Sequence, residues 1–338
     1  MKYSAIDLHS NNNVLVVSDE TDRVLVEKRL PNELSRVLEL LGPHRDELAG
    51  VVVESTYNWY WLVDGLMAAG YRVHLANTGA IKTYDGLKHS GDEADARHLA
   101  HLLRLGILPT GHICPPAERA VRDLARRRLQ LVRSRTSHIL SVENQLTRQT
   151  GRHIRSNEVK RLNAQAVAAM GLPDDVARGM AANVAVIQTL NDEIEKLEAR
   201  LLDAVTKTAG WPLLNSVPGI GKVLAIVILL EIGSISRFAD VGNFASYARC
   251  VDSVRISNGK KKGQGNTKNG NKYLSWAFVE AAHFAARFCP EAKRFYSKKF
   301  AKTNGAVATK ALAHKLARAC YHMLKTGQTF DVKRCFAG

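Results

Sequence analysis

The amino-terminal third of the chain alternates short apolar runs with polar turns and with segments of helical periodicity. Three β-rich runs come first, and the polar turns between them predict an antiparallel meander. They cover residues 4–7, 13–17 and 24–30. The later patterns predict a helix over 32–41, a strand over 51–53, a helix over 59–69 and a strand over 71–75. We therefore expect residues 1–110 to form a mixed α/β domain.

The region that follows has the pattern of long helices. Between residues 116 and 208, apolar positions recur at heptad spacing with charged residues between them. One seam consists of Ile187, Leu190, Ile194, Leu197, Leu201 and Ala204, and a second, in an arginine-rich stretch, of Ala125, Val132, Ile139 and Leu146. Two such helices predict a helical coiled-coil region over 111–208. It is either an antiparallel arm or a dimerising coiled coil, because the seam fits both.

Residues 209–338 are expected to form a third, mainly α-helical domain. Near its start, the turn Pro218-Gly219-Ile220-Gly221 precedes Lys222 and an apolar helix over 223–232. The turn resembles a helix-hairpin-helix, in which glycines let backbone N–H groups approach a phosphate and the next helix N-terminus adds partial positive charge. Gly219, Gly221 and Lys222 are thus candidate nucleic-acid contacts, and a plain interhelical turn is the alternative.

A lysine- and glycine-rich segment lies further along this domain. Residues 256–266 lack apolar residues after Ile256, which predicts a mobile surface loop that orders on nucleic acid. Its candidate phosphate-binding residues, with those just after it, are Lys260, Lys261, Lys262, Lys268 and Lys272. A helix over 306–324, with lysines on one face and alanine and leucine on the other, is expected to close the core.

The net charge of the chain indicates the class of partner. The charge is +16 at pH 7, with a pI of about 9.7, and the excess is clustered. Twelve Lys and Arg stand against four acidic residues over 118–161, and twelve against two over 255–302. Such stripes fit a nucleic-acid backbone, whose counterions they displace. Arg126, Arg127 and Arg128 are candidate contacts in the first stripe.

Other features argue against a secreted or membrane protein. Asp7 interrupts the only early apolar stretch, so no signal peptide is expected, and the longest apolar run, over 223–230, is far too short to cross a bilayer. The five cysteines are scattered without C-x-x-C spacing, which predicts reduced thiols and a cytoplasmic protein.

Four acidic residues are the strongest chemical signal. Asp7 lies in the first predicted strand, Glu54 ends the run Val51-Val52-Val53, and Asp92 and Asp95 lie one helical turn apart. Three antiparallel strands followed by strand–helix units are the order of a ribonuclease-H-like fold, in which strand-end acids of this kind meet a helix that carries more. Two hard divalent ions need several oxygen ligands on rigid elements. The pattern predicts a two-metal phosphoryl-transfer site, with Mg²⁺ as the cofactor and Mn²⁺ as a substitute.

These blocks together resemble a known family. They are Ile6-Asp7, Val53-Glu54-Ser55-Thr56, the 92–100 block with both aspartates, Pro218-Gly219-Ile220-Gly221, and Ser257-Asn258-Gly259 with Lys268-Asn269-Gly270 downstream. Over essentially its whole length the chain resembles DEDD-type transposases of the insertion sequence 110/1111 family, related to the pilin-gene-inverting recombinase. The resemblance implies a RuvC-like metal site of Asp7, Glu54, Asp92 and Asp95, and Ser257 as a nucleophile that forms a covalent protein–DNA intermediate.

The resemblance also implies partners. They are DNA (the element ends and the target) and a structured noncoding guide RNA. A homo-oligomer, a dimer or a tetramer, is expected from the heptad seam. Because a serine hydroxyl needs activation, and Ser257 belongs to another predicted domain than the acids, we expect an active site assembled across a domain or protomer interface.

Two other functions stay open. A Holliday-junction or structure-specific endonuclease would use the same acids with water as nucleophile, and a non-catalytic DNA-binding protein would need none of them. Among the remaining candidates, His98 and His101 could assist a metal ion, and Glu93 or Asp85 could replace one of the acids. A sugar-kinase relative of the same fold is disfavoured, because it needs a glycine hairpin after the first strand and the first glycine is Gly42.

Overall fold

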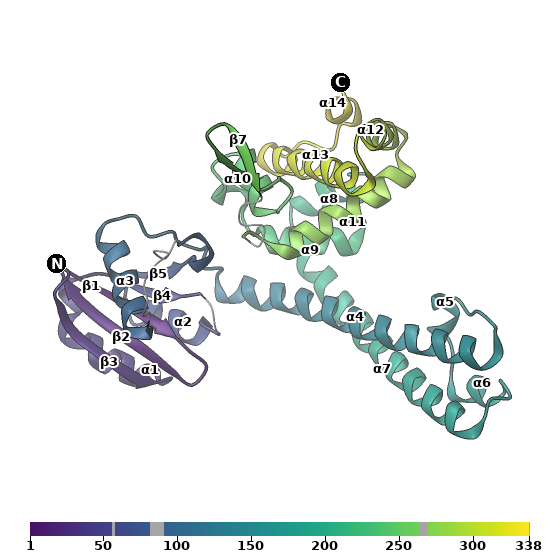
Figure 1. Cartoon of the computed structure of the whole chain (residues 1–338), viewed down its shortest axis with the longest axis horizontal. Coiled ribbons are helices and arrows are strands. Elements are labelled where there is room, and N and C mark those ends of the chain that lie inside the picture. The colour runs from purple at the N-terminus through teal and green to yellow at the C-terminus, as the bar shows by residue number, and fades with distance from the viewer. Residues whose placement is uncertain (56–57, 82–90, 264–268, 338) are drawn as a thin grey trace. The chain divides into compact units, whose positions relative to one another are not determined.

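The computed structural model describes residues 1–55, 58–81, 91–263 and 269–337. The chain divides into two compact units, Met1–Pro116 and Ala117–Gly338 (Figure 1). Thr56, Asp85 and Lys268 lie outside the described residues. The prediction of three domains, with a boundary near residue 208, stays a prediction.

A five-stranded sheet forms the centre of the first unit. Its strands are β1 (Lys2–Leu8), β2 (Asn12–Asp19), β3 (Val24–Pro31), β4 (Leu48–Glu54) and β5 (Val73–Ala76). They lie in the order β3-β2-β1-β4-β5 (Figure 1). The first three strands pair antiparallel, while β4 runs parallel to β1 and β5 parallel to β4. The predicted meander and the predicted strands that follow it are confirmed.

Helices cover both faces of this sheet. They are α1 (Leu34–Leu41), α2 (Tyr60–Ala68) and α3 (Asp92–Arg104), with short 3-10 turns at Gly42–Glu47 and Thr78–Ala80. Ile6 and Leu8 share a core with α1 and α2, whereas Ala5 packs with Leu99 and Ala100 of α3. Side chains alternate between the faces of a strand, so Asp7 lies on the α3 face. The central strand is therefore apolar on both faces, which explains why its sequence lacks strict alternation.

The second unit begins with a helical hairpin. Its long helices are α4 (Pro116–Thr150) and α7 (Asp174–Val205), joined through α5 (Ser156–Val159) and α6 (Ala164–Ala168) (Figure 1). Arg128 bonds Glu198, and Arg135 bonds Asn191, so the two helices run antiparallel. Every seventh residue from Met180 to Leu201 of α7 is buried. Of the two arrangements predicted for the seam, the chain forms the antiparallel arm, and Leu190 and Leu197 stay only half-buried.

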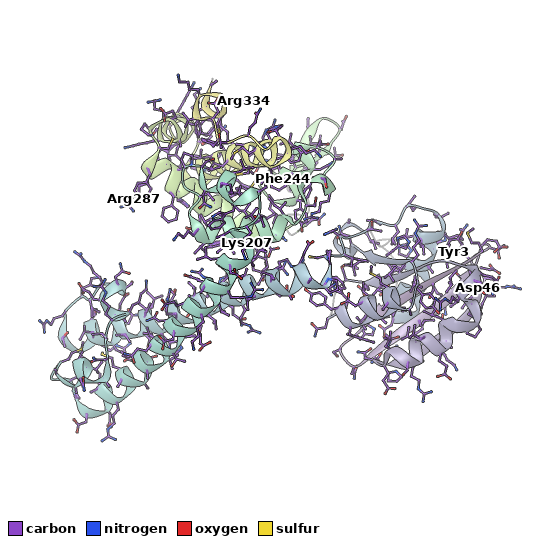
Figure 2. The ribbon with its side chains drawn as sticks, turned by 180° about the vertical axis from the view of Figure 1, so that it is seen from behind. Tyr3, Asp46, Lys207, Phe244, Arg287 and Arg334 are labelled. Carbon is purple, nitrogen blue, oxygen red and sulfur yellow. The ribbon has the colours of Figure 1, made fainter. Side chains whose placement is uncertain are left out.

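A helical body completes the second unit. It contains α8 (Gly210–Asn215), α9 (Lys222–Ile232), a 3-10 turn at Ile235–Arg237, α10 (Val241–Tyr247), β6 (Arg255–Ser257), β7 (Lys260–Gly263), α11 (Lys272–Phe288), α12 (Pro290–Phe300), α13 (Gly305–Thr326) and α14 (Val332–Phe336). Phe244 is fully buried at its centre, whereas Arg287 and Arg334 project from its surface (Figure 2). Leu312 and Leu316 of α13 lie in the same core, as the sequence predicted.

One local prediction agrees with the structure, and another needs correction. The break between the two long helices agrees with the predicted Gly- and Asn-containing stretch, since turns follow Gly151 and Gly171, both with positive φ. Residues 255–263 form a β-hairpin rather than a loop, because Asn258 and Gly259 supply a tight turn that pairs β6 with β7. In the described part of the chain, no helix combines the length and apolarity that crossing a membrane requires.

Candidate functional site

The two strand acids are neighbours in the sheet. Ile6 of β1 pairs with Val53 of β4 in parallel register, so the next positions along the two strands are Asp7 and Glu54. Adjacent strands lie about 4.8 Å apart. The side chains of Ala5 and Val52 pack on α3. Asp7 lies two residues after Ala5, and Glu54 lies two residues after Val52. Asp7 and Glu54 therefore occupy adjacent positions on the α3 face of the sheet.

Helix α3 brings the second pair of acids to the same face. It starts at Asp92, and Ala96, Leu99 and Ala100 are buried against the sheet. Asp92 lies one helical turn before the buried Ala96, and Asp95 lies one turn before the buried Leu99. Both acids therefore lie on the side of the helix that faces the sheet. The amino end of a helix carries partial positive charge, which favours acids in its first turn.

The electrostatics of Asp95 reflect the proximity of Asp7 and Asp92. Partial desolvation raises the pKa of the Asp95 carboxyl, and the charges of Asp7 and Asp92 raise it further. Asp7 itself is only 3% exposed. A buried carboxylate facing other carboxylates is unfavourable unless a cation offsets the charge. This donor set therefore fits a divalent metal ion.

Two further side chains lie within the cluster. Nε2 of His9 lies 3.3 Å from Oδ2 of Asp7 and 3.2 Å from Oδ2 of Asp92. Nη2 of Arg29 donates to the same Asp92 oxygen at 2.7 Å and to Oε1 of Glu93 at 3.2 Å. The hydrogen bond from Arg29 is the main reason that the pKa of Asp92 lies below its usual range. Asp7, His9 and Asp92 each offer one donor atom, all within 4.8 Å of one another.

Sequence analysis missed His9 and Arg29. His9 follows Asp7 by two residues, the spacing that places two side chains on one side of a strand, so this signal was present in the sequence. Arg29 pairs with Val14, and Val14 with Asp7, across three strands. Only the register of the sheet places Arg29 in the row of Asp7.

The alternative ligands have other contacts. Nδ1 of His101 lies 2.9 Å from Oδ2 of Asp22, at the other end of α3 from Asp92. Glu93 accepts from Arg29, so its carboxylate supports the cluster from outside. The charge of His98 partly opposes the rise in the pKa of Asp95.

The two glycines of the turn before α9 have different surroundings. Gly219 has φ +90°, and a Cβ there would lie 2.6 Å from the backbone nitrogen of Ala285 in α11. Gly219 is therefore required for packing. Gly221 has an ordinary φ of −89°, and a Cβ there would meet no atom within 4 Å. Gly221 precedes the exposed Lys222, and the first N–H groups of α9 have no side-chain cap.

Ser257 is the last residue of β6, directly before the Asn258-Gly259 turn. Both turn residues have positive φ, 49° and 69°, as a type I′ turn requires. Ser257 pairs with Lys260 in the hairpin, and Lys260, Lys261 and Lys262 are all exposed. The candidate nucleophile and the lysines therefore lie on one exposed hairpin. Lys272 is exposed at the start of α11.

The three adjacent arginines of α4 differ in their contacts. Arg126 donates to both oxygens of the buried Glu231, at 2.6 and 2.7 Å, and Arg128 bonds Glu198. The pKa of Arg126 is raised above its usual value by the hydrogen bond to Glu231, against the effect of burial. Arg127 bonds only the neutral Gln130. Arg127 is thus the one whose charge is not offset by a carboxylate in the described structure, and the role of all three in nucleic-acid binding stays a prediction.

Comparison with known proteins decides the family. An IS110-type DEDD transposase model matches residues 5–150, and the model of the transposase IS116/IS110/IS902 family matches residues 212–297. The chain belongs to this transposase family. The region 5–150, matched by the DEDD transposase model, contains all four acids. The region 212–297, matched by the second model, contains the turn at Gly219 and the hairpin of Ser257.

Two Streptomyces coelicolor relatives support the assignment to the IS110-type family. The 43.6 kDa protein of insertion element IS110 is 28% identical over 172 residues, and the mini-circle candidate transposase for IS117 is 33% identical over 144 residues. These segments are 50% and 40% of this chain, and 41% and 33% of the relatives. The matches thus span less than half of either relative.

Proposed function

We propose that this IS110-type protein is a transposase that cuts and rejoins the DNA strands of a mobile insertion sequence. The observation that carries the proposal is the convergence of Asp7 and Glu54 of adjacent strands with Asp92 and Asp95 of α3. We assign the first unit to the ribonuclease-H-like, RuvC-like class. Support comes from three antiparallel strands followed by two parallel ones in the order β3-β2-β1-β4-β5.

The acids provide the setting for metal-dependent chemistry. Bound Mg²⁺ or Mn²⁺ would increase the acidity of the attacking hydroxyl and neutralise charge on the leaving oxygen. Asp7 holds its carboxylate rigidly, because it is buried in the central strand. Arg29 orients Asp92 through a hydrogen bond of 2.7 Å. Glu54 and Asp95 complete the set of oxygen donors, and a two-ion site would use all four acids.

Ser257 is the proposed nucleophile. Its Oγ would form an ester bond with a DNA phosphorus while one P–O bond of the strand breaks, and the departing DNA oxygen would take up a proton. One phosphoester bond replaces another in the covalent intermediate. A second DNA hydroxyl can therefore displace Ser257 and rejoin the strand. Exposure of Ser257 beside three lysines supports this role, since phosphate needs both access and positive charge.

The basic surfaces define the proposed partners. We propose that Lys222, Arg127 and the lysines of the β6–β7 hairpin contact the phosphates of the element ends and the target DNA. Exposed Gly221 and the uncapped start of α9 support a helix-hairpin-helix contact at that turn. Family membership supports a noncoding guide RNA as a second nucleic-acid partner.

Labelled DNA that carries joined element ends tests this function. The chain, purified with any RNA that accompanies it, is incubated with Mg²⁺, and products are separated on denaturing gels. A slow, protease-sensitive DNA adduct is expected for wild type and is expected to be lost in Ser257→Ala and Asp7→Ala. Asp46→Ala is the control, because Asp46 is exposed (Figure 2) and precedes β4, at the other end of that strand from Glu54.

A structure-specific endonuclease is the second candidate, because all four acids belong to the first unit and water needs no serine. Cleavage without an adduct, retained in Ser257→Ala and lost in Asp7→Ala, would establish the endonuclease. DNA binding by wild type and both variants, with cleavage by none of the three proteins, would establish an architectural protein.

We also propose that the chain self-associates through its helical hairpin. Leu190 and Leu197 belong to the heptad seam but stay half-buried within one copy, so a second copy can cover them. Leu197→Asp is expected to yield a monomer that lacks strand exchange. A monomeric Leu197→Asp protein with full activity would refute this role of the seam.

A further inference from the structure

His9 has an unusual position between two carboxylates. Its Nε2 atom is buried, and although two carboxylate oxygens lie within 3.3 Å, neither contact has hydrogen-bond geometry. The ring nitrogen therefore lies close to both Asp7 and Asp92. A histidine placed only to neutralise the acids would donate to one of them.

The separations match those of donor atoms that share a metal ion. Nitrogen and oxygen donors lie roughly 2.1 Å from a small divalent ion, so two neighbouring donors lie roughly 3.0 to 3.4 Å apart. Nε2 of His9 is 3.3 Å from the Asp7 oxygen and 3.2 Å from the Asp92 oxygen. All three donor atoms lie within 4.8 Å of one another, so rotation of the partly exposed His9 and Asp92 side chains would let one ion contact all three.

The surroundings hold this arrangement in place. The backbone N–H of His9 donates to the carbonyl of Asn12 at 2.9 Å, and its carbonyl accepts from Nδ2 of Asn32 at 3.0 Å. Asp7 is fixed in β1. Arg29 donates to the Asp92 oxygen, which keeps a lone pair for a metal ion, and such outer hydrogen bonds orient ligands in metal sites.

We propose that His9 is a direct metal ligand, together with Asp7 and Asp92, in the acid cluster to which we assign catalysis. The inference rests on that proposed function and adds a nitrogen donor to a site otherwise built from oxygen. Imidazole suits first-row transition ions, whereas Mg²⁺ takes oxygen ligands. This position therefore binds Mn²⁺ more tightly than Mg²⁺, and His9 is the residue that causes the difference.

Mn²⁺ itself is the probe. The metal-free 338-residue chain is titrated with Mn²⁺, free Mn²⁺ is measured by electron paramagnetic resonance, and Mg²⁺ is used as competitor. His9→Ala is expected to weaken Mn²⁺ binding at least about tenfold, the lower end of the effect of outer ligands, and to change Mg²⁺ binding less. His101→Ala is the matched control, since His101 belongs to the same unit and pairs with Asp22.

A spectroscopic signature separates ligation from a structural effect. Bound Mn²⁺ is expected to show electron spin echo modulation from an imidazole nitrogen in wild type and His101→Ala. His9→Asn keeps a polar side chain, and its Mn²⁺ signal is expected to lack this nitrogen coupling. Thermal unfolding of the metal-free variants verifies that they fold.

The outcomes distinguish the two proposals. Unchanged Mn²⁺ affinity in a folded His9→Ala protein, or nitrogen coupling that persists in His9→Asn, overturns the role of His9 and leaves the acid site standing. Failure of wild type to bind Mn²⁺ overturns both proposals.

Discussion

At the scale of single residues, two glycines of one turn have different physical reasons to be there. A Cβ on Gly219 would clash with the backbone of α11, and the positive φ of Gly219 disfavours any side chain. Gly221 meets neither restriction. A glycine that packing does not require, next to uncapped N–H groups, is a sign that a ligand approaches the backbone.

Gly219→Ala is expected to lower the free energy of unfolding by about 2 to 4 kcal/mol, through strain and overpacking against α11. Gly221→Ser is expected to leave stability unchanged or slightly raised, because serine caps helices well. Its hydroxyl would occupy the free N–H groups of α9, so DNA affinity is expected to fall. Urea unfolding and DNA titration check both variants. Equal DNA affinity in Gly221→Ser and wild type would exclude the turn as a phosphate contact.

Adjacent arginines also have separable roles. Glu231 is buried and accepts from Arg126 and from Nδ2 of Asn271 at 2.7 Å, and Asn271 caps α11. Arg126→Ala leaves that carboxylate without its main partner, so a loss of about 3 kcal/mol in unfolding free energy is expected. Arg127→Ala should change stability by under about 0.5 kcal/mol and reduce DNA affinity. Urea unfolding and DNA binding of the pair measure this; a stable Arg126→Ala protein would contradict it.

At the scale of elements, ion pairs attach α3 to β3 and to the turn between β2 and β3. Arg97 contacts Glu27 of β3 at 2.7 Å through Nη2, and Arg104 contacts Asp22 in the β2–β3 turn at 2.6 and 2.7 Å. Together with the pair between Arg29 and Asp92, these ion pairs are distributed along α3 from its first residue to its last. The position of the helix acids thus depends on side chains far from them in the sequence.

The pH dependence of this attachment has a defined sign. Hydrogen bonds from Arg97 and Arg104 lower the pKa of Glu27 and Asp22, so both pairs stabilise the fold at neutral pH and lose that effect as pH falls through the lowered pKa values. Glu27→Gln with Asp22→Asn is expected to reduce stability by about 1 kcal/mol near pH 7, and by less near pH 2, because protonation of the two carboxyl groups weakens both pairs. Unfolding at both pH values tests this; an equal deficit at both would show that the effect is not electrostatic.

The β6–β7 hairpin presents three lysines that no carboxylate pairs with among the described residues. Replacing Lys260, Lys261 and Lys262 with glutamine is expected to lower the slope of log affinity against log salt by about 2 to 3 for duplex DNA. Lys196 pairs with Glu193, and Lys207, labelled in Figure 2, pairs with Asp203, so replacement of these two lysines should leave the slope unchanged. Affinities measured over a salt series decide; an unaltered slope in the triple variant would remove the hairpin from the interface.

At the scale of the whole molecule, the two units have separate hydrophobic cores. Thermal unfolding is therefore expected to show two transitions, because units with separate cores can unfold independently. A cation that binds the acid cluster stabilises only the first unit, by about 2.7 kcal/mol at a hundredfold excess over its dissociation constant. Calorimetry with and without Mn²⁺ should show one transition shifted upward in wild type. A shift retained in Asp7→Asn would place the cation elsewhere.

The sequence alone predicted the meander and the long helices, and it singled out the four acids as candidates. Apolar periodicity marked the meander, the long helices and α13, because burial of one face leaves a repeat that can be read directly. Acids that end apolar strands or open a helix are rare enough to stand out. At Ser257 the structure has a β-hairpin where the sequence predicts a loop, because exposed lysine strands carry no apolar alternation.

Tertiary structure decided the rest, since register, burial and long-range pairing are not local properties. Strand register brought Arg29 into the row of Asp7, and helix packing gave Gly219 a role that its neighbour Gly221 lacks. Packing of α9 against α4 placed Glu231 beside Arg126 and left Arg127 unpaired with any described carboxylate. The sequence thus determined which residues can do chemistry, and the fold determined which of them meet.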